Sequence, residues 1–288
     1  MVGDLVYHPA SEKLGEALLD VYALPGATGG PVVVIFHGGG AARYMSPYPA
    51  LASALAEQGA VVFVPDWDKG EPVTDTTRDD LLAWADGGAC AVSYALAHAA
   101  EYGADPERLV LFGHSGGAGV ASLVGLREAV PLPECAVEMA PFVVDGMVLW
   151  EGDWLASDTV WDPYGEGLPL VMEGATPWVW LATGPRMPVE LVTTVVGRNE
   201  QRRCDVAEAD APYWERDPDG WFRERLEASG ALGDGCIDVG EATEILADAM
   251  REQGFDVVEL LLEEATHATL HPEGQALLVD EIIAIADR

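Results

Sequence analysis

Residues 109–117 read LVLFGHSGG, and this stretch decides the fold. Its four leading apolar residues are typical of a short buried β-strand, and the glycines that follow predict a tight turn. A helical pattern then continues to about Leu126, so the sequence predicts a strand, a turn and a helix in succession. Such a turn would lift the Ser115 hydroxyl above the edge of the sheet and hold it at the amino end of the helix. There the helix dipole favours developing negative charge.

A second glycine-rich turn lies earlier in the chain. Residues 31–36, PVVVIF, predict another buried strand, which ends at the sequence HGGG of residues 37–40. Glycines allow backbone N–H groups to approach a negatively charged oxygen closely. The two motifs together predict that Gly38, Gly39 and Gly116 donate hydrogen bonds to an oxyanion beside the serine. A flexible strand-to-helix turn is the alternative interpretation of HGGG.

The rest of the chain alternates strands with helices. Further strands are predicted at 60–64, 143–150, 189–196 and 257–262, and helices at 49–58, 77–102, 241–253 and 273–286. Short apolar strands that alternate with helices predict a mostly parallel sheet with helices on both faces. We therefore expect a single α/β domain over residues 1–288, with loop or small cap insertions near 151–182 and 204–240.

The composition excludes several kinds of function. The 288 residues include 15 basic and 49 acidic side chains, a formal charge of −34, and 49% of them are hydrophobic. This charge repels phosphate backbones and anionic lipids, so we expect no nucleic-acid partner. No apolar run reaches the roughly 18 residues of a transmembrane helix, so we expect no membrane span. The first residues lack the basic and apolar segments of a secretory signal, which predicts a cytoplasmic location.

The acidic excess itself has two interpretations. Only Lys13 and Lys69 are lysines. An acid-rich, lysine-poor surface suits a protein adapted to high salt, where repulsion between like charges is screened. The alternative is compositional drift in an organism rich in Ala, Gly, Asp and Glu. The dependence of stability on salt distinguishes the two.

The four cysteines show no CxxC pair and no companion histidine at zinc-binding spacing. They are Cys90, Cys135, Cys204 and Cys236. Without a secretory signal we expect reduced thiols. If a disulfide forms, Cys204 and Cys236 are the expected pair, because they bracket one acidic stretch.

The motifs resemble the α/β-hydrolase fold and, within it, the esterases that carry an HGGG-type loop. The resemblance begins at residues 19–25, LDVYALP, continues through 59–66 and 103–117, and closes at 264–267, EATH. It implies a serine nucleophile, a histidine base and an acid. His114 stands before the serine, where relatives of hormone-sensitive lipase usually have Asp. That is closer to the pattern of smaller carboxylesterases and arylformamidases.

The base must come from six histidines, because imidazole takes and returns a proton near neutral pH. The resemblance favours His267, which follows the last predicted strand where this fold presents its base. We expect His37 and His114 to orient the backbone within the two glycine motifs. His8 lies in the N-terminal segment and His98 within a predicted helix, and we expect His271 to be a loop or cap residue.

The acid is open between two residues. The resemblance implies that the acid follows the strand at 189–196 and that a glycine stands three residues before it. Gly197 and Glu200 match this spacing. Asp205 is the alternative, because aspartate is the commoner third member of such triads. Either carboxylate would hold the imidazole in its working tautomer.

Tryptophans concentrate after the predicted strand at 143–150, where this fold commonly has cap or pocket elements. Trp154 and Trp161 are candidates for substrate contacts, because an aromatic wall suits an acyl or aryl group. Simple packing is the alternative interpretation.

The sequence thus predicts a serine hydrolase of short-chain or aryl carboxylic esters that works through an acyl-enzyme. This mechanism requires no cofactor and no metal. The expected partner of the protein is a small-molecule ester substrate, and the sequence leaves open whether the chain forms a homodimer. An amidase of the arylformamidase type is the first alternative, because the same triad cuts activated amides. A catalytically silent binding protein on a hydrolase fold is the second.

Overall fold

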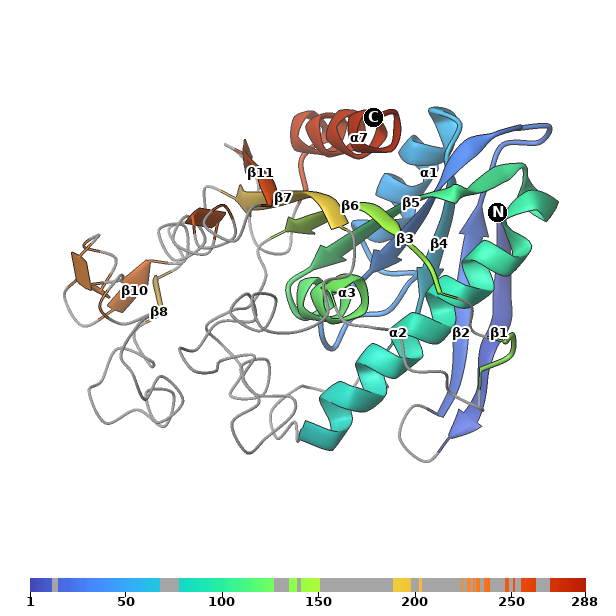
Figure 1. The fold of residues 1–288 in the computed structure, drawn as a ribbon, viewed down its shortest axis with the longest axis horizontal. Helices are drawn as coiled ribbons and strands as arrows, with labels where there is room; N and C mark the ends of the chain where they lie inside the picture. Colours follow the sequence, from blue (N-terminus) through green and yellow to red (C-terminus); the bar gives the residue numbers. More distant parts are fainter. Residues whose placement is uncertain are drawn as a thin grey trace.

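The structure is a computed structural model, and it is built around one large sheet covered by helices on both faces (Figure 1). It describes residues 1–11, 15–67, 78–126, 135–138, 141–150, 189–197, 202–203, 224, 227–228, 230, 232–233, 236–238, 247–248, 251, 255–262 and 270–288. Within these residues, eight strands form the sheet in the order β1 (Val2–Ser11), β2 (Gly15–Tyr22), β4 (Val61–Pro65), β3 (Gly30–Phe36), β5 (Ala104–His114), β6 (Val144–Trp150), β7 (Val189–Gly197) and β11 (Asp256–Leu262). β2 is antiparallel to both β1 and β4, and all other neighbours are parallel.

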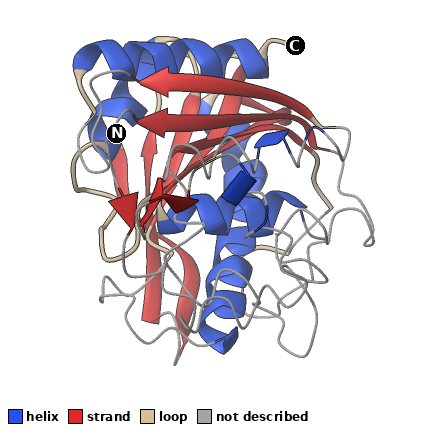
Figure 2. Cartoon of the chain, turned by 90° about the vertical axis from the view of Figure 1, so that its left-hand side faces the viewer, coloured by secondary structure: helices blue, strands red, loops and turns tan. Residues whose placement is uncertain are grey.

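Helices lie between these strands in the sequence, and a further helix follows the last strand. They are α1 (Tyr48–Glu57), α2 (Arg78–His98), η1 (Ala99–Tyr102), α3 (Gly116–Leu126) and α7 (Pro272–Ala286). α1 and α7 cover one face of the sheet, and α2 and α3 cover the other (Figures 1 and 2). A separate small antiparallel sheet consists of β8 (Arg202–Arg203), β10 (Cys236–Asp238) and β9 (Leu232–Gly233).

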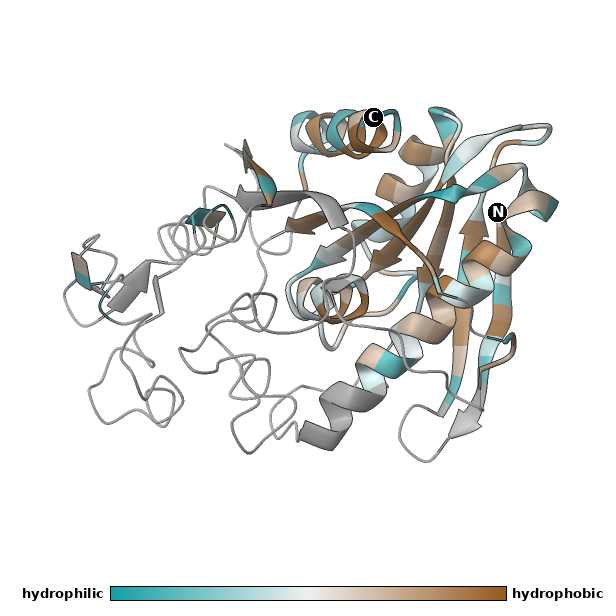
Figure 3. Cartoon of the chain, viewed as in Figure 1, coloured by the Kyte–Doolittle hydropathy of each residue, from teal (hydrophilic) through white to brown (hydrophobic). Residues whose placement is uncertain are grey.

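The central strands are apolar along their whole length because both of their faces are covered. In β3, Val32, Val34 and Phe36 belong to the core on the side of α2 and α3. Val33 and Ile35 belong to the core on the side of α1 and α7. Successive side chains of a strand point to opposite faces, so each central strand supplies both layers of the core. Figure 3 shows the resulting concentration of hydrophobic residues in the middle of the sheet.

The predicted fold class is confirmed, and every strand predicted from the sequence is present. The sequence analysis did not predict β1 and β2. β1 is an edge strand whose register against β2 shifts three times, and it contains Gly3, Asp4 and Pro9, which strands disfavour. These interruptions remove the alternation that identifies a half-buried strand.

Other sequence predictions fall on residues that the structure does not describe. The expected insertion at 151–182 lies entirely outside the described residues, and the one at 204–240 is described only in short pieces. Of the helix predicted at 241–253, only 247–248 and 251 are described, and these are helical. Among the described helices, none is both long and apolar enough to cross a membrane.

Cys90 of α2 forms a disulfide with Cys135, and their Cα atoms lie 5.3 Å apart. The expectation of reduced thiols is therefore wrong for this pair. The two cysteines are 45 residues apart in sequence, so no local spacing pattern indicates the bond. Cys204 lies outside the described residues, and its pairing with Cys236 of β10 stays a prediction.

Candidate active site

The carboxyl ends of the parallel strands meet at one edge of the sheet, and the turn after β5 carries Ser115. Its φ is +53°, in the left-handed region that residues other than glycine rarely adopt. The Ser115 N–H donates to the carbonyl of Trp150, the last residue of β6, at 3.0 Å. The Ser115 carbonyl accepts from the N–H of Ala118 at 2.9 Å, in the first turn of α3. These hydrogen bonds hold a strained turn of the kind called a nucleophile elbow.

Close packing explains the glycines on either side of the serine. A Cβ on Gly113 would collide with the carbonyl of Gly117, and a Cβ on Gly117 would collide with the carbonyls of Phe36 and His37. The turn after β5 therefore packs backbone against backbone on the HGGG loop after β3. The two motifs that the sequence analysis singled out thus form one structural unit.

Two of the predicted oxyanion donors lie side by side in this unit. A Cβ on Gly116 would lie 3.2 Å from the backbone nitrogen of Gly39. Neither of these two N–H groups donates a hydrogen bond to another residue within the part of the chain that the structure describes. Gly116 is also the first residue of α3, where the helix dipole adds positive potential. The pair can therefore receive a negatively charged oxygen beside the serine.

The third predicted donor, Gly38, is engaged elsewhere. Its N–H donates to the hydroxyl of Tyr48 at 2.7 Å. The single Gly38 N–H proton is therefore directed at that hydroxyl, whereas no such contact engages the amides of Gly39 and Gly116 within the described residues. The roles of these three glycines as oxyanion donors stay predictions.

His37 and Trp67 fix the start of the HGGG loop. His37 is fully buried, and its ring stacks on Trp67 with 5.4 Å between the centroids. The Trp67 Nε1–H donates to the His37 carbonyl at 2.8 Å, and His37 Nδ1 lies 2.9 Å from the carbonyl of Gly38. The Trp67 ring would lie 3.4 Å from a Cβ on Gly116. Trp67 therefore also forms a wall beside the elbow.

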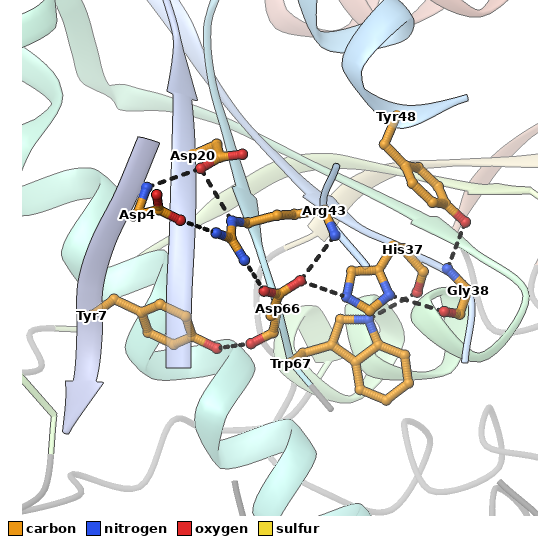
Figure 4. A network of polar contacts seen from close by, with 9 residues as sticks. All are labelled: Asp4, Tyr7, Asp20, His37, Gly38, Arg43, Tyr48, Asp66 and Trp67. Atoms are coloured by element: carbon orange, nitrogen blue, oxygen red, sulfur yellow. Dashed lines mark hydrogen bonds and ion pairs between the residues drawn. The ribbon is translucent and has the colours of Figure 1, made fainter. Parts of the chain in front are cut away.

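A cluster of charges fixes the later part of the loop, as Figure 4 shows. Arg43 is buried, and its guanidinium pairs with three carboxylates, those of Asp4, Asp20 and Asp66. The Arg43 N–H also donates to Asp66 at 2.9 Å, and His37 Nε2 lies 3.5 Å from the same carboxylate. Asp4 belongs to β1, Asp20 to β2, and Asp66 directly follows β4. One arginine thus joins the loop to three strands.

The charges of this cluster shift its pKa values. Burial by itself raises the pKa of Asp66, but the contacts with His37 and Arg43 outweigh it and hold the pKa below its usual value. Burial by itself lowers the pKa of Arg43, but the hydrogen bond and charge of Asp20 and the charge of Asp66 raise it above the usual value. Arg43 and Asp66 are therefore both charged at neutral pH.

Most of the other predicted site residues lie outside the described residues: His267, Glu200, Asp205, Trp154 and Trp161. The strands that precede two of these candidates are described. β7 ends at Gly197 and β11 at Leu262, and these two residues are register partners in the sheet. His271 is exposed and directly precedes α7, in agreement with the predicted loop or cap position.

Sequence reasoning missed four residues that build this site: Arg43, Tyr48, Asp66 and Trp67. Asp66 and Trp67 directly follow β4. Because residues that follow parallel strands gather at the same end of the sheet, this position could have indicated that both residues lie at the site. The roles of Arg43 and Tyr48 depend on partners distant in sequence, and no spacing pattern indicates them. Among the described residues, no group of three or more His, Cys, Asp or Glu side chains could hold a metal ion.

Comparison with protein families gives one match. A family model described as BD-FAE matches residues 19–140, which contain both the HGGG loop and the elbow serine. A search of curated proteins found no match to the chain.

Solved structures resemble the chain over nearly its whole length. A dienelactone hydrolase from Anabaena variabilis is 16% identical, with a TM-score of 0.56, over 98% of this chain and 95% of that one. An esterase from Thermogutta terrifontis is 18% identical, with a TM-score of 0.56, over 99% of this chain and 92% of that one. Esterase B from Lactobacillus rhamnosis is 14% identical, with a TM-score of 0.59, over 99% of this chain and 85% of that one. The protein has the α/β-hydrolase fold.

Proposed function

We propose that the protein is a serine hydrolase of carboxylic esters and that Ser115 is its nucleophile. The observation that carries this proposal is the elbow itself. Ser115 sits in a strained turn at the amino end of α3, beside the paired amides of Gly39 and Gly116. A serine in such a turn with adjacent oxyanion donors is what acyl transfer requires.

The proposed reaction proceeds through an acyl-enzyme. Ser115 Oγ attacks the ester carbonyl carbon, and His267 takes the hydroxyl proton as general base. The N–H groups of Gly39 and Gly116 stabilise the oxyanion of the tetrahedral intermediate. His267 then gives its proton to the departing alcohol, and the acyl group stays on Ser115. A water molecule, deprotonated by the same histidine, hydrolyses the acyl-enzyme and releases the acid.

The sheet register supports His267 as the base. His114 pairs with Trp150, Trp150 with Val195, and Val195 with Leu260. Because strands lie about 4.8 Å apart, β11 runs about 14 Å from the serine strand at this level. His267 follows the end of β11 by five residues, which can span up to about 17 Å. A histidine at this position is therefore within reach of Ser115.

The same register supports an acid after β7. Glu200 follows Gly197 by three residues, and Gly197 pairs with Leu262, from which the chain leaves toward His267. The two segments thus start from adjacent points on one edge, and a carboxylate three residues later can meet the imidazole. Asp205 remains the alternative acid. For the substrate we propose a short-chain or aryl ester, with Trp154 and Trp161 as further contacts.

Hydrolysis of p-nitrophenyl acetate and butyrate tests the proposal. Ser115→Ala should lower kcat/KM at least about a thousandfold. Ser122→Ala is the matched control, because this buried serine lies on the same helix and donates to the Ala118 carbonyl at 2.7 Å. It should keep wild-type activity. A Ser115→Ala variant that retains turnover would exclude Ser115 as the nucleophile, and formanilides cleaved with a higher kcat/KM than esters would favour the amidase alternative.

A further inference from the structure

The hydroxyl of one buried tyrosine touches both motifs of the site. Tyr48 is the first residue of α1, and only 2% of it is exposed. Its oxygen lies 2.7 Å from the Gly38 nitrogen and 2.8 Å from His114 Nδ1. Gly38 belongs to the loop after β3, and His114 directly precedes the elbow serine after β5. The hydroxyl therefore bridges the oxyanion loop and the nucleophile elbow.

Both hydrogen bonds can exist at the same time. A phenol oxygen has one proton and two lone pairs, so it can accept from the Gly38 N–H while it shares a proton with His114 Nδ1. The His114 ring is held from its other side, because it stacks on Trp150 with 4.1 Å between the centroids and an angle of 27° between the planes. His114 cannot turn away without losing this contact. The bridge is thus set in rigid surroundings.

The bridge lies directly beside the serine and the HGGG loop. A Cβ on Gly38 would lie 3.3 Å from both the Tyr48 oxygen and His114 Nδ1, and 3.5 Å from the Ser115 Cβ. Gly39, the next residue, supplies one of the two oxyanion amides. An oxyanion donor works at about 2.7–3.1 Å, so a shift of a few tenths of an ångström weakens it. A group that fixes Gly38 against His114 also fixes the Gly39 amide against Ser115.

We propose that Tyr48 is a positioning residue for catalysis, which sets the geometry of the oxyanion site through its hydrogen bonds to Gly38 and His114. This inference rests on the proposed esterase function. Tyr48 does not need to touch the substrate for this role. Tyr48 acts through the amide that binds the oxyanion, and this oxyanion exists in the tetrahedral intermediates of both acylation and deacylation. Loss of the Tyr48 hydroxyl should therefore slow both steps and leave substrate binding unchanged.

The test compares Tyr48→Phe with wild type on p-nitrophenyl butyrate. We expect kcat to fall about tenfold or more while KM stays within about twofold. The inhibition constant of an alkyl trifluoromethyl ketone, whose adduct with the serine carries an oxyanion, should rise by the same factor as kcat/KM falls. Tyr102→Phe is the control, since its ring packs edge-on against Phe63 far from the elbow, and it should keep wild-type kinetics.

A second pair of variants separates positioning from folding. His114→Asn keeps a hydrogen-bonding atom two bonds from Cβ, as Nδ1 is, whereas His114→Leu removes it. His114→Asn should retain most of the kcat that His114→Leu loses. In the Tyr48→Phe/His114→Leu double variant, the fold-decrease in kcat should be smaller than the product of the fold-decreases in the two single variants. The comparison of His114→Asn with His114→Leu decides the question even if Tyr48→Phe fails to fold.

The outcomes are distinguishable from failure of the proposed function. A wild-type protein that hydrolyses no ester overturns the function and this inference with it. An active wild type with a folded Tyr48→Phe variant of equal kcat overturns only the role of Tyr48. Equal losses in His114→Asn and His114→Leu, or a ketone inhibition constant unchanged by Tyr48→Phe, would also overturn it.

Discussion

Two arginines, which lie at opposite ends of the strands of the sheet, are held in different ways. Arg43, at the carboxyl edge, has 9% of its side chain exposed and pairs with three carboxylates. Arg108, near the amino end of β5, has 30% of its side chain exposed. It donates to the carbonyls of Ala286 and Gly29 and pairs with Asp287 at 2.6 Å. Arg43 joins the HGGG loop to the sheet, whereas Arg108 joins the end of α7 to it.

Burial and position decide what each arginine contributes. Removing one partner from a buried ion cluster leaves uncompensated charges, and that costs much more than losing an exposed pair. Arg43 also holds the HGGG loop, which includes Gly39, one of the two proposed oxyanion donors. Its loss should therefore reduce both stability and activity, whereas loss of Arg108 should reduce stability alone.

Arg43→Met should produce the largest effect. It leaves the carboxylates of Asp4, Asp20 and Asp66 together without their counter-charge, so we expect the free energy of unfolding to fall by about 3 kcal/mol. Because the HGGG loop loses its anchor, kcat should fall at least about tenfold. Urea unfolding and p-nitrophenyl butyrate hydrolysis measure the two quantities. An undiminished kcat in the folded variant would contradict the anchoring role.

Asp66→Asn should show a pH-dependent effect. The pKa of Asp66 is lowered in the folded protein, so its carboxylate stabilises the fold above the ordinary value of 3.8. That stabilisation is lost as the pH falls through the lowered folded pKa. Asp66→Asn should therefore melt below wild type at pH 7, and the difference in Tm should shrink as the pH falls below about 4. A difference in Tm that does not change with pH would be inconsistent with this charge.

Salt should change stability more than activity. With a formal charge of −34, self-repulsion weakens the native state at low ionic strength, where the Debye length is about 30 Å at 0.01 M. At about 1 M NaCl it is about 3 Å, so Tm should rise by several degrees while kcat for a neutral ester stays within a few-fold. Melting curves and ester assays across the series measure both. A flat or falling Tm would favour compositional drift over adaptation to salt.

Arg108→Met should have the smallest effect. The loss of hydrogen bonds from a partly exposed guanidinium costs about 1 kcal/mol, and kcat should stay within twofold because the elbow lies at the opposite edge. Its ion pair is more exposed than those of Arg43 with Asp20 and Asp66, so molar NaCl should reduce the Tm difference for Arg108→Met more than for Arg43→Met. A kcat loss comparable to that of Arg43→Met would remove the distinction between the two arginines.

The central fold was predictable because its strands are local signals. Residues 31–36 and 109–112 are buried on both faces and read as continuous apolar runs, each followed by glycines. The order of these motifs also pointed to Ser115, Gly39 and Gly116. The hydrogen bond of the Gly38 N–H was not predicted, because a glycine motif does not say where each N–H points. That direction is set by Tyr48, which lies on a different element.

The charged anchor of the loop could not be predicted in the same way. Arg43 meets partners on β1, β2 and the end of β4, and such contacts depend on strand order, which the sequence does not state. β1 itself was missed because Gly3 and Pro9 interrupt its pattern. The disulfide of Cys90 and Cys135 is likewise a contact between distant segments. Local patterns predicted the elements and the turn that carries Ser115, and tertiary contacts determined what holds that turn and the HGGG loop in place.

The most direct test of the central claim is to locate the site of reaction with a fluorophosphonate. Trypsin should release residues 109–127 as one peptide, which contains both Ser115 and Ser122, and tandem mass spectrometry can assign the label between them. We predict one label per chain, on Ser115, retained in Ser122→Ala and absent from Ser115→Ala. An unlabelled wild-type protein, as expected for a catalytically silent binding protein, or a label on another residue would contradict the account.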